Sequence, residues 1–175
     1  MVDLQQLRYP IGKYLRPTEL PLDDRARAAL ISDIERAPAA LRAAVAGLSD
    51  EQLNTPYRPG GWTIRQVVHH VPDSHLNGYT RMRLAATEDN PTIKPYQEAR
   101  WAELPDVHSV PVDVSLALLD ALHLRWTAFL RGLAASDFQR TYLHPELGIV
   151  PLDVAIGIYA WHGKHHTAHI TNALK

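Results

Sequence analysis

The sequence contains no cysteine, and this absence excludes disulfide bonds, zinc fingers, iron–sulfur clusters and a cysteine nucleophile. A transition metal, if one is bound, must therefore be held by histidine and carboxylate ligands. A strong excess of charge is missing as well, because the net charge is −1. We expect no nucleic-acid partner, since no overall basic field would attract a phosphate backbone.

Long apolar runs are also absent. None approaches the ~20 residues that a membrane-spanning helix needs, because Asp113, Asp120 and Asp153 interrupt the best candidates. The N-terminal residues MVDLQQLRYP lack the basic start and the apolar region of a secretory signal. We therefore expect no membrane partner and a cytoplasmic location.

What the chain does have is the size and composition of one globular domain. It has 175 residues, of which 46% are hydrophobic and 21% charged, enough to bury a core. Four segments show helical periodicity: 23–48, 63–88, 113–133 and the segment from about residue 152 onward. We predict an all-α fold, a four-helix bundle, formed by a single domain over residues 1–175.

Local signals mark the ends and the irregular points of these helices. Thr63 and Gln66 have the spacing of a capping box, and Asp113 is a natural N-cap for the third helix. Pro38 and Pro72 lie inside the first and second helices, where we expect each to bend its helix.

A long segment, residues 89–111, separates the second and third helices. It contains too many prolines for a regular element, namely Pro91, Pro95, Pro105 and Pro111. Segments of this length are uncommon in compact domains and often functional. It can equally be a crossover between two helices that run the same way. Strand signals are weak, because the stretch LGIVPL is short and interrupted by proline.

The stretch YAWHGKHHTAHI, residues 159–170, holds four histidines: His162, His165, His166 and His169. A helix turns about 100° per residue, so all four rings fall within a sector of about 100°. That sector continues the core-facing stripe of its helix. Buried imidazoles need hydrogen-bond partners, and a shared metal ion is one good way to satisfy them.

Two pairs have the i, i+4 spacing that lets two imidazoles share one ion: His162 with His166, and His165 with His169. Helical spacing does not choose between them. His162 and His169 are about 10 Å apart along the helix axis, too far for one ion. Catalytic zinc sites usually have three protein ligands, so a further ligand must come from elsewhere.

The stretch VVHHVPDSH on the second helix offers such a ligand. His70 shares a face with polar residues that include Gln66, Asp73 and Ser74, and periodicity alone places this face in solvent. His70 therefore reaches an interior site only if the face looks into a cavity. A bend at Pro72 is one way to aim it inward.

The remaining histidines and the tryptophans are expected to be ordinary packing or surface residues: His75, His108, His123 and His144, and Trp62, Trp101, Trp126 and Trp161. The stripe Leu116, Leu119, His123, Trp126 and Leu130 is typical of a bundle core. The arginines of the first helix and Lys164 are typical of a solvated face.

Together these motifs resemble the YfiT-like branch of the DinB superfamily. The resemblance is carried by residues 55–96, by HLRWTAFLRGL, by YAWHGKHHTAHI and by the N-terminal YPIGKY, and so covers nearly the whole chain. It implies a four-helix bundle with a long crossover between the second and third helices, usually as a homodimer. It also implies one divalent metal ion per subunit, nickel or zinc, held by three histidines.

Carried over residue by residue, the resemblance places the metal ligands on His70, His162 and His166. His70 is the second of the paired histidines in the second helix, and the other two are the first and third histidines of WHGKHH. The last two form one of the pairs that helical spacing allows. The family commonly has alanine where this chain has Pro72, which affects the helix geometry expected there.

The resemblance implies a metal-dependent hydrolase acting on a small molecule. Two alternatives stay open. One is a thiol S-transferase, like other DinB-like bundles, with bacillithiol, mycothiol or glutathione as cosubstrate; the other is a bundle that binds a metal or small molecule without turnover. Asp73, one turn beyond His70, is the candidate catalytic base or orienting partner. His165 and His169 are candidates for contacts behind the ligands.

Overall fold

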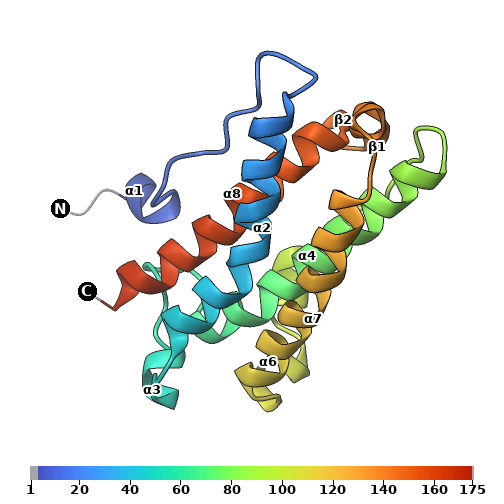
Figure 1. Ribbon diagram of the computed structural model, residues 1–175. Helices are drawn as coiled ribbons and strands as arrows, with labels where there is room; N and C mark the ends of the chain where they lie inside the picture. The colour runs from blue at the N-terminus through green and yellow to red at the C-terminus, as the bar shows by residue number, and fades with distance from the viewer. Residues whose placement is uncertain (1–3, 175) are drawn as a thin grey trace.

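Four long helices form the frame of the structure, a computed structural model that describes residues 4–174. They are α2 (Asp24–Val45), α4 (Ile64–Thr87), α7 (Val112–Arg131) and α8 (Leu152–Ala173). Helices α2 and α4 each pack against both α7 and α8 (Figure 1). The predicted all-α four-helix bundle is confirmed, and each helix lies within a few residues of its expected place.

Short elements connect and flank these helices. They are α1 (Leu4–Arg8), α3 (Asp50–Leu53), α5 (Glu98–Trp101), α6 (Pro105–Ser109), the 3₁₀ helix η1 (Ala135–Gln139) and the strands β1 (Thr141–His144) and β2 (Gly148–Pro151). The two strands form an antiparallel hairpin in which Thr141 pairs with Pro151 and His144 with Gly148. The weak strand signal in the sequence therefore did not predict this hairpin. Pro151 is tolerated because it is the last residue of its strand, and Gly148 supplies the positive φ, +71°, at the turn.

The helix ends follow the predicted signals at one position and depart from them at another. Thr63 caps α4, its hydroxyl accepting from the Gln66 backbone N–H while the Gln66 side chain accepts from the Thr63 backbone N–H. The predicted capping box is confirmed. Asp113 is not the N-cap of α7, because the helix already begins at Val112 after Pro111. Asp113 lies in the first turn instead, where its negative charge still favours the helix N-terminus.

Both internal prolines lie in helices that continue through them, Pro38 in α2 and Pro72 in α4. Proline has no backbone N–H, so each removes the hydrogen bond that its helix would make to the carbonyl four residues earlier. The carbonyl groups concerned are those of Ile34 and Val68. The prolines therefore change the hydrogen bonding of the two helices without ending them.

The segment between α4 and α7 is a crossover that contains α5 and α6. Figure 1 shows α4 and α7 running in the same direction, so the chain has to return along the bundle between them, as predicted. The crossover packs on the polar face of α4, where the Gln66 Nε2 donates to the Ala102 carbonyl at 3.0 Å and to Glu103 at 2.9 Å. This cover buries a face that periodicity alone places in solvent: Gln66 and Ser74 are 7% exposed and His70 is 5% exposed.

The core lies between the four long helices. The stripe predicted on α7 is confirmed, because Leu116, Leu119, His123, Trp126 and Leu130 are all buried. None of the helices within residues 4–174 combines the length and the apolar character that a bilayer crossing requires.

One arginine of α2 departs from the expected solvated face. Arg27 is buried and makes two hydrogen bonds to the buried carboxylate of Asp153 on α8, at 2.9 and 3.1 Å. The same carboxylate accepts from the Leu22 backbone N–H at 3.0 Å, and Arg27 donates to the Leu22 carbonyl at 2.8 Å. This network joins α2, α8 and the segment that precedes α2. The two buried charges are tolerated there because each has an opposite charge and hydrogen-bond partners.

We expect Asp153→Ala to lower the free energy of unfolding by about 3 kcal/mol, because it removes the buried counter-charge of Arg27 and leaves only the exposed carboxylate of Asp24 beside the guanidinium. Denaturant unfolding followed by circular dichroism measures the change. Glu35→Ala is the matched control, since Glu35 pairs with Arg131 on the surface, and we expect a far smaller effect there. Equal losses in the two variants would show that the buried pair has no special role.

Candidate metal centre

Three histidines from two helices converge inside the bundle. His70 comes from α4, and His162 and His166 come from successive turns of α8. Each offers one ring nitrogen, and the three nitrogens all lie within 4.8 Å of one another. The structure thus brings together the three residues that the family resemblance selects. Helical spacing alone accounts for the proximity of His162 to His166, and the packing of α4 against α8 adds His70.

The spacing of these nitrogens suits one metal ion. The Nε2 atoms of His70 and His162 are 3.3 Å apart. Two nitrogens bound at 2.0–2.1 Å to a tetrahedral ion lie about 3.3 Å from each other. The ligand atom of His166 lies within 4.8 Å of both of the others.

Burial keeps these rings uncharged at neutral pH. It lowers the pKa of His70 to about 4. It also lowers the pKa of His162 and of His166 well below the ordinary value, with a further contribution from the neighbouring histidines. A neutral imidazole has a free lone pair, so protons do not compete with a metal at these nitrogens near pH 7.

An aromatic ring and a hydroxyl group lie beside the three histidines. The Trp62 ring lies 4.7 Å from the His70 ring, between centroids. The Ser74 hydroxyl lies 3.5 Å from Nε2 of His162. His70 and His166 are buried, but His162 is only half-buried. His162 is thus the most exposed of the three converging histidines.

The alternative pair, His165 and His169, occupies a different environment. His165 stacks on Trp161 with centroids 4.3 Å apart, and its Nδ1 is buried without a hydrogen-bond partner. His169 stacks on Tyr57 at 4.0 Å. Within residues 4–174 neither ring belongs to a group of three converging ligand atoms. The geometry thus favours the His162–His166 pair between the two pairs that spacing left open.

Asp73 lies one turn beyond His70 and is partly buried. Burial raises the pKa of its carboxyl to about 6, and the nearby Asp106 adds to the rise. Within the described part of the chain its carboxylate makes no hydrogen bond to His70, His162 or His166. The predicted orienting contact is therefore not made by Asp73 in this structure, and its role as a base stays a prediction.

Two histidines that we expected to be ordinary core residues are connected to the site. His75 and His123 are buried, as expected for core positions, but His75 lies 3.0 Å from Nδ1 of His162 and 2.7 Å from His123. A signal for this was present in the sequence, since a histidine inside an apolar stripe must find a polar partner. The sequence does not show which residue that partner is. His108, by contrast, is exposed.

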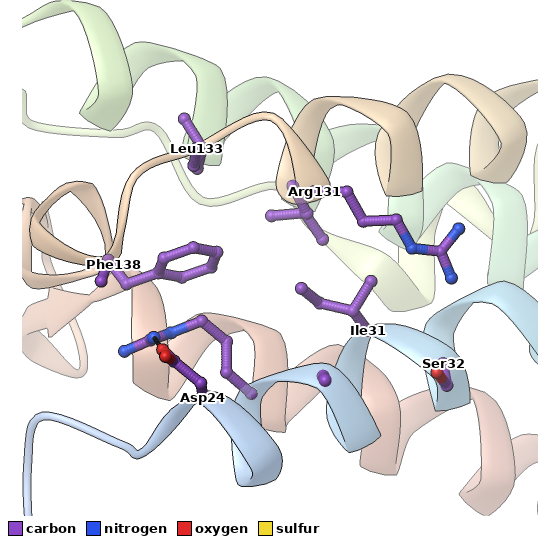
Figure 2. Close-up of a pocket in the computed structure, with 10 residues that line it drawn as sticks. Asp24, Ile31, Ser32, Arg131, Leu133 and Phe138 are labelled. Carbon is purple, nitrogen blue, oxygen red and sulfur yellow. Dashed lines mark hydrogen bonds and ion pairs between the residues drawn. The ribbon is translucent and has the colours of Figure 1, made fainter.

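A separate cavity of ≈ 270 Å³ lies between α2, the end of α7 and η1. Figure 2 shows Phe138 and Ile31 directed toward one another across it. None of the three converging histidines lines this cavity. Its Arg27 guanidinium lies 4.4 Å from the Phe138 ring and is already bonded to Asp153. This cavity is thus distinct from the candidate metal centre.

Known proteins resemble this chain over nearly all of its length. Residues 33–170 match the family profile described as the DinB superfamily. A protein of Bacillus cereus strain B4264 is 56% identical, and one of Bacillus thuringiensis subsp. konkukian strain 97-27 is 55% identical, each match covering 98% of both chains. Both relatives have the provisional name metal-dependent hydrolase.

A solved structure is similar as well. YfiT from Bacillus subtilis, described as "a probable metal-dependent hydrolase with an unusual four-helix bundle topology", superimposes with a TM-score of 0.92 at 47% identity. The match covers 96% of this chain and 95% of that one. The resemblance expected from the sequence motifs is confirmed.

The raised pKa of Asp73 predicts a pH-dependent effect of Asp73→Asn on stability. The carboxyl titrates near pH 6 when folded and near 3.8 when unfolded, so the folded state loses stability as pH rises through this window. We expect the free energy of unfolding of the variant, relative to that of the wild type, to rise by about 1–2 kcal/mol from pH 4.5 to pH 7.5. This value is already reduced because Asp73 is partly exposed. Urea unfolding of the chelator-treated protein at both pH values measures it.

Asp89→Asn provides the control, because it makes the same exchange at an exposed carboxyl. The histidines titrate in all three proteins and cancel in the comparison. An Asp73→Asn variant whose advantage stays flat or shrinks toward pH 7.5 would contradict a raised pKa at Asp73.

Proposed function

The chain belongs to the DinB superfamily, and from this membership and the three converging histidines we propose that it is a metal-dependent hydrolase of small molecules. The observation that carries the proposal is the convergence of His70, His162 and His166, with one ring nitrogen of each within 4.8 Å of the others. The names of the relatives support the same function.

We assign the metal ligands to His70, His162 and His166, with one ion per subunit. Three neutral imidazoles and no sulfur or carboxylate form a donor set that suits zinc or nickel. The 3.3 Å separation of two of the nitrogens supports this assignment. The partial exposure of His162 supports a centre that keeps a position for water or substrate.

An ion held in this way supplies Lewis acidity and lowers the pKa of a water molecule to about 7. The protein's own contribution is to hold the ligands in a shielded pocket and to accept a proton. Asp73 is the proposed general base, because a carboxyl with a pKa of about 6 is largely ionised at pH 7 and still basic enough to take a proton. The Ser74 hydroxyl, 3.5 Å from Nε2 of His162, is placed to contact a bound substrate.

The substrate is proposed to be a small molecule that enters beside His162. Homodimer formation and a cytoplasmic location stay predictions from the sequence.

We expect His70→Ala, His162→Ala and His166→Ala each to reduce bound metal to well below one ion per chain, since each removes one of three ligands. Elemental analysis of the purified proteins measures the ratio. His144→Ala is the matched control, because His144 is also a buried histidine but lies on β1. Loss of metal only in His165→Ala and His169→Ala would overturn the ligand assignment.

Metal-loaded protein is expected to hydrolyse at least one member of a panel of esters, amides and lactones. The activity should disappear with a chelator and return with zinc or nickel, and Asp73→Asn should reduce it by about 10²–10⁴-fold. A second panel pairs glutathione, bacillithiol or mycothiol with an electrophile. Metal-dependent conjugation without hydrolysis would favour the thiol transferase, and no turnover in either panel would favour a binding protein.

A further inference from the structure

The imidazole of His162 is the first of three rings joined end to end in the core. Its Nδ1 lies 3.0 Å from Nε2 of His75, and Nδ1 of His75 lies 2.7 Å from Nε2 of His123. The row ends on the main chain of α2, where Nδ1 of His123 lies 2.6 Å from the carbonyl oxygen of Ile34. That carbonyl is available because residue 38 is proline and has no N–H to offer it.

The carbonyl at the end fixes the direction of every hydrogen bond in this row. A carbonyl oxygen only accepts, so Nδ1 of His123 must carry the proton. A neutral imidazole has one N–H, so Nε2 of His123 accepts from Nδ1 of His75, and Nε2 of His75 accepts from Nδ1 of His162. His162 is left with a bare Nε2. This is the nitrogen that lies 3.3 Å from Nε2 of His70.

A second row fixes His166 in the same manner. Nε2 of His169 lies 3.1 Å from the carbonyl oxygen of Arg8, so this nitrogen donates. Nδ1 of His169 then accepts from Nδ1 of His166 at 3.4 Å, and His166 is left with a bare Nε2. Arg8 is the last residue of α1, and the N–H of Gly12, four residues on, bonds to the Tyr9 carbonyl instead. The Arg8 carbonyl therefore also lacks a helical donor.

We propose that His75, His123 and His169 are positioning residues that set the tautomers of His162 and His166, through two rows anchored on the carbonyls of Ile34 and Arg8. The inference rests on the proposed function only in taking His162 and His166 as the metal ligands. Metal-bound histidines usually donate their second N–H to a carboxylate, a carbonyl or water. Here the acceptor is another histidine, whose own tautomer is fixed in turn by a hydrogen bond that leads to a backbone carbonyl.

The two anchors come from different parts of the chain. Ile34 belongs to α2 in the bundle, whereas Arg8 belongs to the N-terminal segment that lies beside α8 (Figure 1). The same segment is held on α8 by the Trp161 indole N–H, which donates to Gly12 at 3.2 Å, and by the Tyr14 hydroxyl, which donates to Val154 at 3.2 Å. The N-terminal segment thus contributes to the metal centre without supplying a ligand.

The wild-type protein tests the tautomers directly. In metal-free protein labelled with ¹⁵N in histidine, long-range proton–nitrogen spectra distinguish a protonated ring nitrogen from a bare one. We expect His162 and His166 to be protonated at Nδ1 and bare at Nε2, the form that a free histidine side chain favours less in water. Protonation of Nε2 in either residue would overturn the proposal.

Paired variants test whether the rows act on the metal centre. Leucine in His123→Leu cannot form the hydrogen bonds that link the Ile34 carbonyl to His75. We expect the zinc affinity of this variant to fall about 10–100-fold. The Nε2 signal of His162 should change, and that of His166 should not. His123→Gln can donate to Ile34 and accept from His75, so it should stay within about threefold of wild type. His169→Leu should change His166 and leave His162 as it is. His144→Leu is the buried-histidine control and should bind zinc like the wild type.

Zinc affinity at the wild-type level in His123→Leu or His169→Leu would contradict the proposal, as would equal changes of both ligands in each variant. If a leucine variant fails to fold, the wild-type spectrum and the glutamine variant still decide. These readouts need no catalysis. A protein with the expected tautomers and no hydrolase activity would overturn the proposed function and leave the positioning rows standing.

Discussion

The burial of uncharged imidazoles is the constraint on which the candidate metal centre depends. Each neutral ring has one donor and one acceptor, and both must be directed because little water reaches them. In this bundle Nδ1 of His162 and Nδ1 of His166 each face a further histidine, and Nε2 of His162 lies 3.3 Å from Nε2 of His70. Burial also lowers the pKa of all three rings. The same packing therefore keeps the three rings uncharged and brings one nitrogen of each within 4.8 Å of the others.

The buried histidines find hydrogen-bond acceptors at two points where the regular hydrogen bonding of the helices is interrupted. Pro38 frees the carbonyl of Ile34 within α2, and the end of α1 frees the carbonyl of Arg8. The crossover performs a different task, because α5, α6 and their flanking residues cover the polar face of α4. Without that cover His70 would face solvent, and proton competition and hydration would weaken its hold on a cation.

Much of this arrangement can be predicted from the sequence. The four helices follow from periodicity and caps, and the i, i+4 histidines of α8 follow from helical geometry alone. The choice of His162 and His166 over His165 and His169 does not, because it depends on where α4 packs. His70 was ambiguous for the same reason, since the crossover that buries it is irregular. The pairing of Arg27 with Asp153, and of His75 with His123, joins residues 126 and 48 positions apart, which local patterns do not reveal.

Crystals of the zinc-loaded protein, measured at the zinc absorption edge, give the most direct test of the central claim. The account predicts a single anomalous peak per chain, which marks one zinc ion. That ion should lie about 2.0–2.1 Å from one nitrogen each of His70, His162 and His166, with one coordination position open to solvent. A peak elsewhere, or one whose coordination is completed by a fourth protein ligand, would contradict it.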